Sequence, residues 1–497
     1  MTNGRLSSKW PADGWNPLRK TSHFRRFPGI RRGEPPFDTA EPLSTESVRK
    51  GSNLKWVFLA GLLILTPMLA MFLRNNRQHL PKAAFLLALL PFIEMRLNVT
   101  ASPYTWPAWQ GFVKGIDVSL IDSLAIAMIF ASSPVKTPLR LKLAFSFFLF
   151  VVILSTAFAE IYLPSVFYGW QVVRVLLVYY AVARSSALDK NVPVYLLTGL
   201  VAGLSIQAVV VLQQKLTGQV QAGGWFGHQN LLGMASHFIV YPAFAAFLGG
   251  YYVRRTALCV GAAFIVAWAG GSRATIGLMG LGLGLTILLS CWRRSSSRKM
   301  AVAGLGLLCI VAAVPIFYSA VERRSAEARA ASSEERDRMR AAASMVIADH
   351  PLGVGANRFV AVANVGGYYA RAGVAWSNGA ALVHNTYYLI AAEMGVLGLV
   401  ALIGMMIAVF SLAWDNLKRA PPGFGSEYAL GTAVMVVAVA AHSYYEWITM
   451  YYIIHVMFAM SIGVMVALRA SRTTRKTAPR LDRKEPFDQP LTIPAAA

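Results

Sequence analysis

The chain has 497 residues, of which 56% are hydrophobic and only 14% are charged, and its mean hydropathy is +0.49. Soluble globular proteins carry about 25% charged residues, so this composition excludes a soluble domain and indicates a polytopic membrane protein. The net charge of +24 would suggest nucleic acid in a soluble protein. In a membrane protein, Lys and Arg mark cytoplasmic helix ends and attract anionic headgroups. We therefore expect membrane lipids, and no nucleic acid, as partners.

The first 55 residues are polar and basic. Residues 1–55 hold 11 Lys and Arg against 5 Asp and Glu, with many Pro and Gly, which is typical of a disordered cytoplasmic tail. The first apolar run begins near Trp56, which is the wrong place for a cleavable signal peptide. The cysteines lie in or at the ends of apolar segments, so we expect neither a disulfide framework nor a CxxC metal pair. They are Cys259, Cys291 and Cys309.

Thirteen apolar segments are candidates for spanning helices, each of which needs about 20 mostly apolar residues. They form an N-terminal bundle within residues 56–318 and a C-terminal set within 386–468, and the polar loop 319–385 separates the two. A second basic tail, 469–497, follows and is expected in the cytoplasm. The segments are 56–73, 83–97, 117–132, 141–160, 165–184, 192–213, 230–250, 256–271, 275–292, 300–318, 386–414, 427–446 and 449–468.

Clusters of Lys and Arg fix the orientation of most segments, because such clusters stay at the cytoplasmic face. Five basic stretches are therefore assigned to the cytoplasm. They are Arg184 to Lys190, Arg254-Arg255, the run 293–299, Lys418-Arg419 and the tail from Arg469. This assignment places three stretches outside, namely Gly223–Asn230, Gly270–Thr275 and the loop 319–385. The predicted fold class is an all-α polytopic membrane protein with one large outer loop that contains short amphipathic helices.

Thirteen spans cannot leave both tails in the cytoplasm. The segment 83–97 is short and holds Pro91, Glu94 and Arg96, so we expect it to lie in the outer interface, which leaves about twelve spans. The link 101–109 is rich in Pro and Trp and fits an interfacial aromatic belt. The alternative is an N-terminus outside the cell, which the charge of the tail opposes.

His384 lies in HNTYYLIAAEMGVLGL, where the polar loop enters a membrane helix. A histidine with an ordinary pKa of about 6.5 can accept a proton at neutral pH, so at the mouth of a helix bundle it could deprotonate a sugar hydroxyl. The alternative is a structural, hydrogen-bonded histidine. Glu393 is nine residues further on and points to the opposite face of a continuous helix, which makes it a poor candidate to orient His384. Tyr388, at four residues, shares the face of His384.

The loop segment SSEERDRMRAAASMVIADHP predicts an amphipathic helix over 333–349 that Pro351 ends. We expect Ser332 and Glu335 to form a capping box at its start. An apolar stripe follows along one face. Its residues are Met339, Ala343, Val346 and Ile347.

Arg336 and Arg340 are four residues apart in this helix and share one face. Two guanidinium groups could bind a diphosphate bidentately, as lysine could not. The alternative is a solvated face on which these arginines pair with neighbouring carboxylates. Those carboxylates belong to Glu334, Glu335 and Asp337.

Two further outer stretches hold polar candidates. Arg273 follows two glycines in AGGSRATIG, which allow a tight turn and the close approach of a ligand; the alternative is a snorkelling interfacial arginine. His228 and Asn230 in FGHQNLLG occupy a similar outer position, and we expect Asn230 to cap the helix that follows.

Arg174 lies inside an apolar segment, VFYGWQVVRVLLVYYAVA. It is about ten residues from the outer end, which corresponds to a depth of ~15 Å. A charge at that depth is costly and is usually functional or paired. The alternative to a functional role is a structural ion pair with Asp117, Asp122 or Glu160.

Motifs for metal or nucleotide are not found: the outer loops hold no DxD, and the chain has no HExxH and no P-loop. We therefore expect no cofactor and no bound metal. An enzyme at the outer face would then need a donor that is already activated, such as a lipid diphosphate.

Four stretches in this order resemble the bacterial O-antigen ligase/polymerase superfamily of membrane glycosyltransferases. They are FGHQN-LLG, GGSRAT, ERDRM…ADHPLGVGANRF and VHNTYYLIAAEMGVLGL, and the resemblance covers roughly residues 117–465. It implies about twelve membrane helices, a large periplasmic loop and an inner-membrane location. It also implies metal-independent transfer of a glycan from an undecaprenyl-diphosphate carrier.

The resemblance also implies roles for single residues. His384 would be the general base, and Arg273 and Arg336 would bind the diphosphate. Arg174 matches a basic residue in the helix before these motifs and would also bind the diphosphate. The family often has an aromatic residue four positions after the loop arginine, where this chain has Arg340. The choice among Arg336, Arg338 and Arg340 therefore stays open.

The expected function is an inverting glycosyl transfer at the periplasmic face, in surface polysaccharide assembly. A ligase would use lipid A-core as acceptor, whereas an O-antigen or exopolysaccharide polymerase would use a lipid-linked glycan. Protein O-glycosylation is less favoured, because no large soluble tail follows the last helix. A transporter or flippase of an anionic lipid-linked solute is the alternative from another class. Such proteins often carry an internal repeat, which we do not see in this sequence. A membrane scaffold would leave His384 and the arginines without a purpose.

Overall fold

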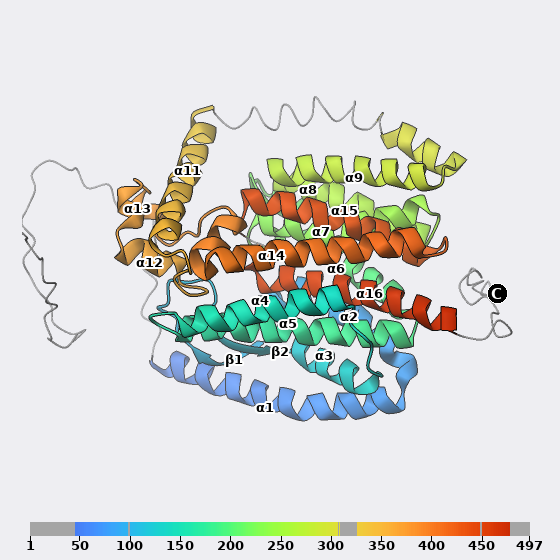
Figure 1. Cartoon of the computed structure of the whole chain (residues 1–497), viewed down its shortest axis with the longest axis horizontal. Helices are drawn as coiled ribbons and strands as arrows, with labels where there is room; N and C mark the ends of the chain where they lie inside the picture. Colours follow the sequence, from blue (N-terminus) through green and yellow to red (C-terminus); the bar gives the residue numbers. More distant parts are fainter. Residues whose placement is uncertain (1–44, 98–99, 307, 309–325, 448–449, 478–497) are drawn as a thin grey trace, which may run out of the picture. The chain divides into compact units, whose positions relative to one another are not determined.

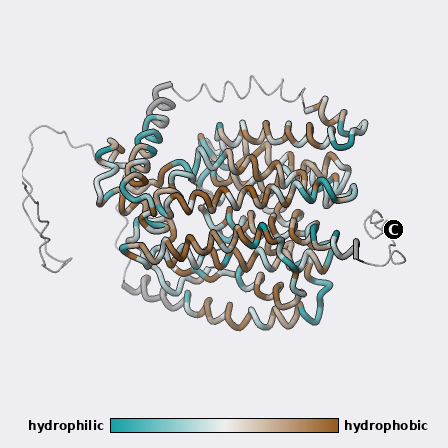
Figure 2. The backbone as a smooth tube through the Cα atoms, viewed as in Figure 1, coloured by the Kyte–Doolittle hydropathy of each residue, from teal (hydrophilic) through white to brown (hydrophobic). Residues whose placement is uncertain are grey.

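The computed structural model describes residues 45–97, 100–306, 308, 326–447 and 450–477. Met1–Lys50 and Gly51–Ala497 are two separate units, and the description below concerns the second. It is built almost entirely of helices, most of which run along a common direction (Figure 1). Hydrophobic residues extend along the long helices (Figure 2). The predicted fold class, an all-α polytopic membrane protein, is confirmed.

Ten of the described helices are long and apolar enough to cross a membrane. They coincide with ten of the thirteen predicted segments, because about 20 apolar residues can satisfy all their backbone hydrogen bonds only as a helix in lipid. They are α1 (Thr45–Asn75), α4 (Leu139–Ala157), α5 (Leu163–Leu188), α6 (Val192–Leu216), α7 (Gln229–Leu248), α8 (Val253–Gly270), α9 (Arg273–Arg293), α14 (Thr386–Arg419), α15 (Phe424–Tyr445) and α16 (Tyr452–Thr477).

Two predicted segments fall partly outside the described residues. A helix begins at residue 297 and continues to 306, so only the start of the predicted span 300–318 is described. The predicted tail 469–497 begins inside α16, which runs to Thr477, and the rest of that tail lies outside the described residues.

The helix α2 (Leu80–Leu97) corrects our expectation for the segment 83–97. Leu80, Ala84 and Leu87 are fully buried, and α2 packs lengthwise against α6. Gly199 of α6 lies opposite Ala88 of α2. Further along α6, Gln207 donates a hydrogen bond of 2.8 Å to the carbonyl of Phe92 on α2. Because higher numbers on one helix meet higher numbers on the other, the two helices are parallel. The segment thus lies inside the bundle rather than in an interface.

The direction of α1 follows from this packing. The short helix η1 (Arg77–His79) joins α1 to α2, and the ring of His79 stacks on Phe72. The turn between α1 and α2 therefore lies at the end of the bundle where α6 begins. Residues 51–75 of α1 start at the other end, the one that carries α11 to α13 (Figure 1). With a cytoplasmic tail, α1 would start at the end of the bundle where α6 begins, so its direction is opposite to the one we expected. Residues 1–44 themselves lie outside the described residues.

A β-hairpin replaces the start of the predicted span 117–132. Strands β1 (Thr100–Thr105) and β2 (Gly115–Ser119) pair antiparallel, with Thr100 opposite Ser119. The helix α3 (Leu120–Ala131) then begins, because Ser119 and Asp122 form a capping box there. We expected the link 101–109 to form an interfacial aromatic belt, but Trp109 is buried in the protein. Its indole N–H donates a hydrogen bond to the carbonyl of Asn357, 3.0 Å away. Apolar composition alone does not distinguish a buried strand from a helix.

The described part of the loop, from residue 326, contains α11 (Ala326–Asp349), α12 (Phe359–Val365), α13 (Tyr368–Arg371) and η3 (Trp376–Asn378). The predicted apolar stripe of α11 is confirmed: Met339, Ala343 and Val346 are buried and Ile347 is partly buried. The predicted capping box is wrong, because α11 begins upstream of Ser332. Glu335 instead accepts hydrogen bonds from Ala375 N–H and from the Asn378 amide.

The segment PLGVGANRF fixes the loop to α14. Val354 and Gly355 donate backbone hydrogen bonds to the carbonyls of Ala392 and Glu393. At the same level α14 has a non-helical residue, Gly395, with φ 68° and ψ −171°. The carboxylate of Glu393 accepts from Phe359 N–H. Glu393 thus holds the loop rather than His384, in agreement with its predicted place on the opposite face.

Candidate active site

A cavity of about 630 Å³ lies where the starts of α7, α9 and α14 meet the end of α15, and α11 borders it. It brings together six of the predicted site residues, which come from four separate stretches of the sequence. These six are His228, Asn230, Arg273, Arg336, Arg340 and His384. Further polar side chains that line it are Gln221, Gln229, Ser272, Ser333, Tyr444, Tyr445 and Glu446.

His384 is held at the mouth of α14. The next residue, Asn385, caps that helix by accepting hydrogen bonds from Tyr387 and Tyr388 N–H. His384 Nδ1 lies 3.0 Å from Glu446 Oε2. An ionised carboxylate can only accept a hydrogen bond, so Nδ1 carries the proton and donates it. The Nε2 lone pair of the neutral ring is then free to take a proton.

Glu446 follows the last residue of α15 and is only 1% exposed. Its Oε1 accepts from the Arg336 guanidinium at 2.8 Å and from the Asn230 amide at 2.6 Å. Burial by itself would raise the pKa of Glu446, but the hydrogen bond and charge of His384, with the charge of Arg336, hold that pKa below its ordinary value. The carboxylate is therefore ionised at neutral pH. Its backbone carbonyl accepts from Thr386, which joins the end of α15 to the start of α14.

Three arginines border the cavity with different degrees of pairing. Arg336 is bound to Glu446, and Arg340 pairs with Asp337 of its own helix. Arg273 is the first residue of α9, after the N-cap Ser272, and its side chain is exposed. Within the described residues, no carboxylate lies within ion-pair distance of Arg273. Its charge is thus available to an anion in the cavity.

Arg338 lies on another face of α11. It pairs with Glu334 and Glu335 and donates to the carbonyl of Gly373, and it does not line the cavity. Of the three loop arginines, the geometry therefore places Arg336 and Arg340, and not Arg338, at the cavity.

Arg174 also lies away from the cavity. It is 3% exposed, its Nε lies 2.8 Å from Asp122, and its guanidinium stacks 3.9 Å from the Tyr452 ring centroid. Asp117 is 4.0 Å away. The structural ion pair, which was the alternative interpretation, is what the structure contains. The third suggested partner, Glu160, pairs with Arg358 instead.

The residue that caps α7 is not the one that we expected. His228 is the N-cap of α7 and its Nδ1 accepts from Asn230 N–H, so the prediction that Asn230 caps this helix is wrong. Burial lowers the pKa of His228, which favours the neutral ring that capping requires. Tyr388 is not a lining residue of the cavity; it packs against apolar residues of the loop.

Sequence reasoning missed Glu446. It is 62 residues from His384 in the chain, and only the packing of α14 against α15 brings the two together. The available signal was a carboxylate at an outer helix end, in SYYEW, within a chain of 23 acidic residues. Among the described residues, no three His, Cys, Asp or Glu side chains converge as a metal site would require.

Comparison with known proteins identifies the segment that carries most of this site. The family model described as O-antigen ligase matches residues 257–403, from α8 to the middle of α14. The match includes Arg273, Arg336, Arg340 and His384 but not Glu446. A search of the curated proteins found no match. The family carries out glycan transfer in surface polysaccharide assembly. Residues 257–403 are thus similar to the O-antigen ligase family, and this match supports the O-antigen ligase/polymerase superfamily.

Proposed function

We propose that the protein transfers a glycan from an undecaprenyl-diphosphate carrier to an acceptor hydroxyl, with inversion at the anomeric carbon and without a metal. The site would face the periplasm from the inner membrane. The observation that carries the proposal is His384, hydrogen-bonded to the buried carboxylate of Glu446, in a cavity bordered by Arg273, Arg336 and Arg340.

His384 acts as the general base. Its Nε2 takes the proton of the acceptor hydroxyl while that oxygen attacks the anomeric carbon. The bond from this carbon to the diphosphate oxygen breaks, and the diphosphate leaves with the electron pair. Glu446 is a positioning residue: it fixes the tautomer of His384 and stabilises the imidazolium that forms, in the way that a buried carboxylate serves a catalytic histidine elsewhere.

The arginines stabilise the leaving diphosphate. Negative charge grows on its oxygens in the transition state, and prearranged cations are most effective where charge develops. Arg273 is the best placed of the three, because it is exposed to the cavity without a carboxylate partner among the described residues. Arg336 and Arg340 lie on one face of α11, which would cover the donor and exclude water.

The acceptor decides between two chemistries of the same site. A ligase would bind lipid A-core, and a polymerase would bind a second lipid-linked glycan. Both share the donor and the leaving group, so the residues described above serve either one.

The test uses the purified full-length protein with an undecaprenyl-diphosphate-linked glycan, with and without lipid A-core, and resolves the products on a gel. A ladder of longer glycans from donor alone identifies a polymerase, whereas a shift that needs lipid A-core identifies a ligase. We expect His384→Ala to lower the rate about 10²- to 10⁴-fold, the usual contribution of a general base.

The matched control is His350→Gln. His350 is also a loop histidine, but its Nε2 contacts Tyr368 and it does not line the cavity, so this variant should keep its activity. Full transfer by His384→Ala would refute the mechanism. A wild-type protein that forms no product with either acceptor would refute glycosyl transfer to those acceptors.

A further inference from the structure

A second cavity lies at the end of the bundle opposite to the candidate active site. Its volume is about 320 Å³, and it is bordered by the start of α4 and the last turns of α14 and α16. We call it the arginine cavity, because Arg140, Arg419 and Arg469 line it together with Asp415. His384 and Arg419 lie just before the start and at the end of the 34-residue helix α14, so the two cavities are far apart along the bundle.

The charges around the arginine cavity do not balance. Asp415 is shared by Arg419, Arg469 and Arg472, at 2.8, 3.5 and 3.3 Å. Arg140 lies within ion-pair distance of no carboxylate among the described residues. The three arginines and the one carboxylate that line the cavity leave a net charge of +2. Leu139, the first residue of α4, also lines the cavity, and a helix N-terminus adds partial positive charge. The site therefore favours an anion.

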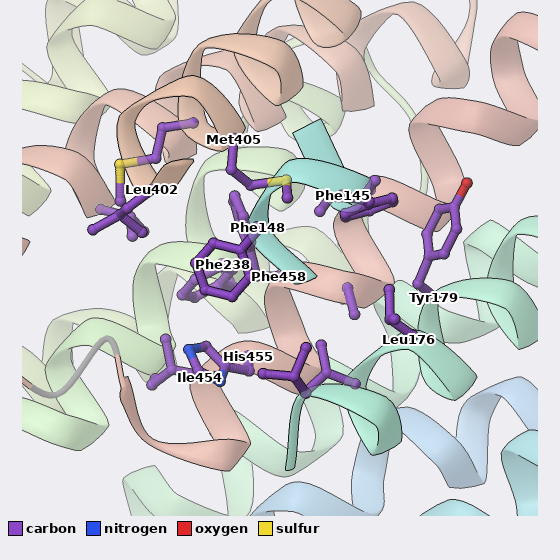
Figure 3. Close-up of a pocket in the computed structure, with 16 residues that line it drawn as sticks. Phe145, Phe148, Leu176, Tyr179, Phe238, Leu402, Met405, Ile454, His455 and Phe458 are labelled. Atoms are coloured by element: carbon purple, nitrogen blue, oxygen red, sulfur yellow. The ribbon is translucent and has the colours of Figure 1, made fainter. Parts of the chain in front are cut away.

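An apolar slot lies next to the arginine cavity along the bundle; α4, α14 and α16 line it too, together with residues of α5, α7 and α15. Figure 3 shows Phe145, Phe148, Leu402, Met405 and Phe458 around its space, which has a volume of about 100 Å³.

The slot and the arginine cavity lie end to end. On α14 the slot ends at Met406 and the arginine cavity begins at Ala408; on α4, Phe145 is about one turn from Leu141. A ligand that fills both must be an anion at one end and a hydrocarbon chain at the other.

We propose that an anionic phospholipid binds here, with its phosphate among Arg140, Arg419 and Arg469 and part of an acyl chain in the apolar slot. Basic pockets between membrane helices suit such headgroups. The lipid diphosphate of the proposed reaction does not fit this place, because its charged end would lie at the opposite end of the bundle. The site is thus separate from the candidate active site, and its test is independent of the transfer reaction.

The experiment measures lipid binding to full-length protein that has been freed of native lipid in detergent. Phosphatidylglycerol, phosphatidylcholine with the same acyl chains, and inorganic phosphate are titrated at one fixed ionic strength, because salt screens these contacts. Native mass spectrometry gives the bound fraction, and the melting temperature gives a second readout. Phosphatidylglycerol should bind at least about tenfold more tightly than the other two, since it alone combines the charge and the chain.

Variants then locate the bound lipid. Each basic group near an anionic headgroup contributes on the order of fivefold to binding, so Arg140→Gln with Arg419→Gln should weaken phosphatidylglycerol binding about thirtyfold. Arg140→Gln alone, which removes an exposed arginine and breaks no ion pair, should weaken it about fivefold and guards against a folding defect in the double variant. Ala459→Leu, which narrows the slot, should weaken phosphatidylglycerol binding as well.

The control is Lys418→Gln. Lys418 precedes Arg419, lies over the Trp414 ring and does not line the arginine cavity, so its loss should leave binding unchanged. An unchanged affinity in the double arginine variant would overturn the proposal. Equal stabilisation by inorganic phosphate, or equal binding of phosphatidylcholine, would overturn it too, because the site would then recognise only one half of the lipid.

Discussion

Glu446 connects three helices at a single carboxylate. Its side chain meets His384 before α14, Arg336 on α11 and Asn230 on α7. A buried carboxylate is stable only when its hydrogen-bonding capacity is satisfied. Because its partners are the residues that line the candidate active site, this carboxylate fixes their mutual positions.

We expect Glu446→Gln to lower the transfer rate about a hundredfold or more, because the amide cannot stabilise a positively charged His384 as the carboxylate does. Initial rates with saturating donor measure the effect, and the melting temperature shows whether the fold persists. Glu334→Gln removes an exposed carboxylate that pairs with Arg338 and should keep the wild-type rate. A Glu446→Gln enzyme of wild-type rate would show that the carboxylate does not assist His384.

The same residue predicts a pH dependence of stability. The pKa of Glu446 in the folded protein lies below its ordinary value of 4.5, so the unfolded chain binds this proton more readily. Its contribution to stability is then complete above pH 4.5 and is lost as pH falls through the folded value. The difference in melting temperature between wild type and Glu446→Gln should therefore shrink between neutral pH and pH values below 4.5. A difference that is constant over this range would contradict the lowered pKa.

At the scale of elements, the kink of α14 and the PLGVG segment form one unit. A Cβ on Gly395 would lie 2.5 Å from the carbonyl carbon of Leu352. A Cβ on Gly353 would lie 2.5 Å from the backbone carbonyl oxygen of Glu393. Gly395 has a backbone conformation that is essentially restricted to glycine. The close approach that follows attaches the loop to the helix that begins just after His384.

Gly395→Ala should therefore destabilise the protein by about 1–3 kcal/mol or more, the cost of such a conformation for a residue with a side chain. Thermal unfolding in detergent measures the loss. Gly404→Ala is the matched control in the same helix, because a Cβ there meets no atom within 4 Å; it should be neutral or slightly stabilising. Equal melting temperatures for the two variants would show that the kink carries no strain.

The whole molecule has two ends of different chemistry. The loop helices and His384 lie at one end, and the arginine cavity lies at the other. The α1–α2 turn shares the second end, since α2 runs parallel to α6. In a membrane these ends would face opposite sides, and from the charge pattern of the sequence we predict that the first faces the periplasm.

Single cysteines test this arrangement in a background whose three native cysteines are replaced by serine. In cells with a permeable outer membrane, an impermeant maleimide should label Ser344→Cys on α11. Lys418→Cys and Arg77→Cys, both at the opposite end, should react only after the inner membrane is opened. Labelling of Arg77→Cys in intact cells would place the α1–α2 turn outside, as expected if residues 83–97 were interfacial.

The membrane class, most of the spans and the residue types of the candidate site could be predicted without the structure. These follow from local properties: a run of apolar residues must form a helix in lipid, and His384, Arg273 and Arg336 lie at the ends of such runs. Even the apolar stripe of α11 could be predicted, because its period is that of a single helix.

Which side chains meet could not be predicted, because it depends on the tertiary packing. Glu446, just after α15, contacts His384, just before α14. Arg174 is paired with Asp122 in a separate cluster, and α2 lies inside the bundle. Each outcome depends on how helices pack, which is set by the shapes of facing side chains and close glycine contacts such as that at Gly199. Hydropathy does not contain this information, because buried and lipid-facing positions of a membrane helix are both apolar.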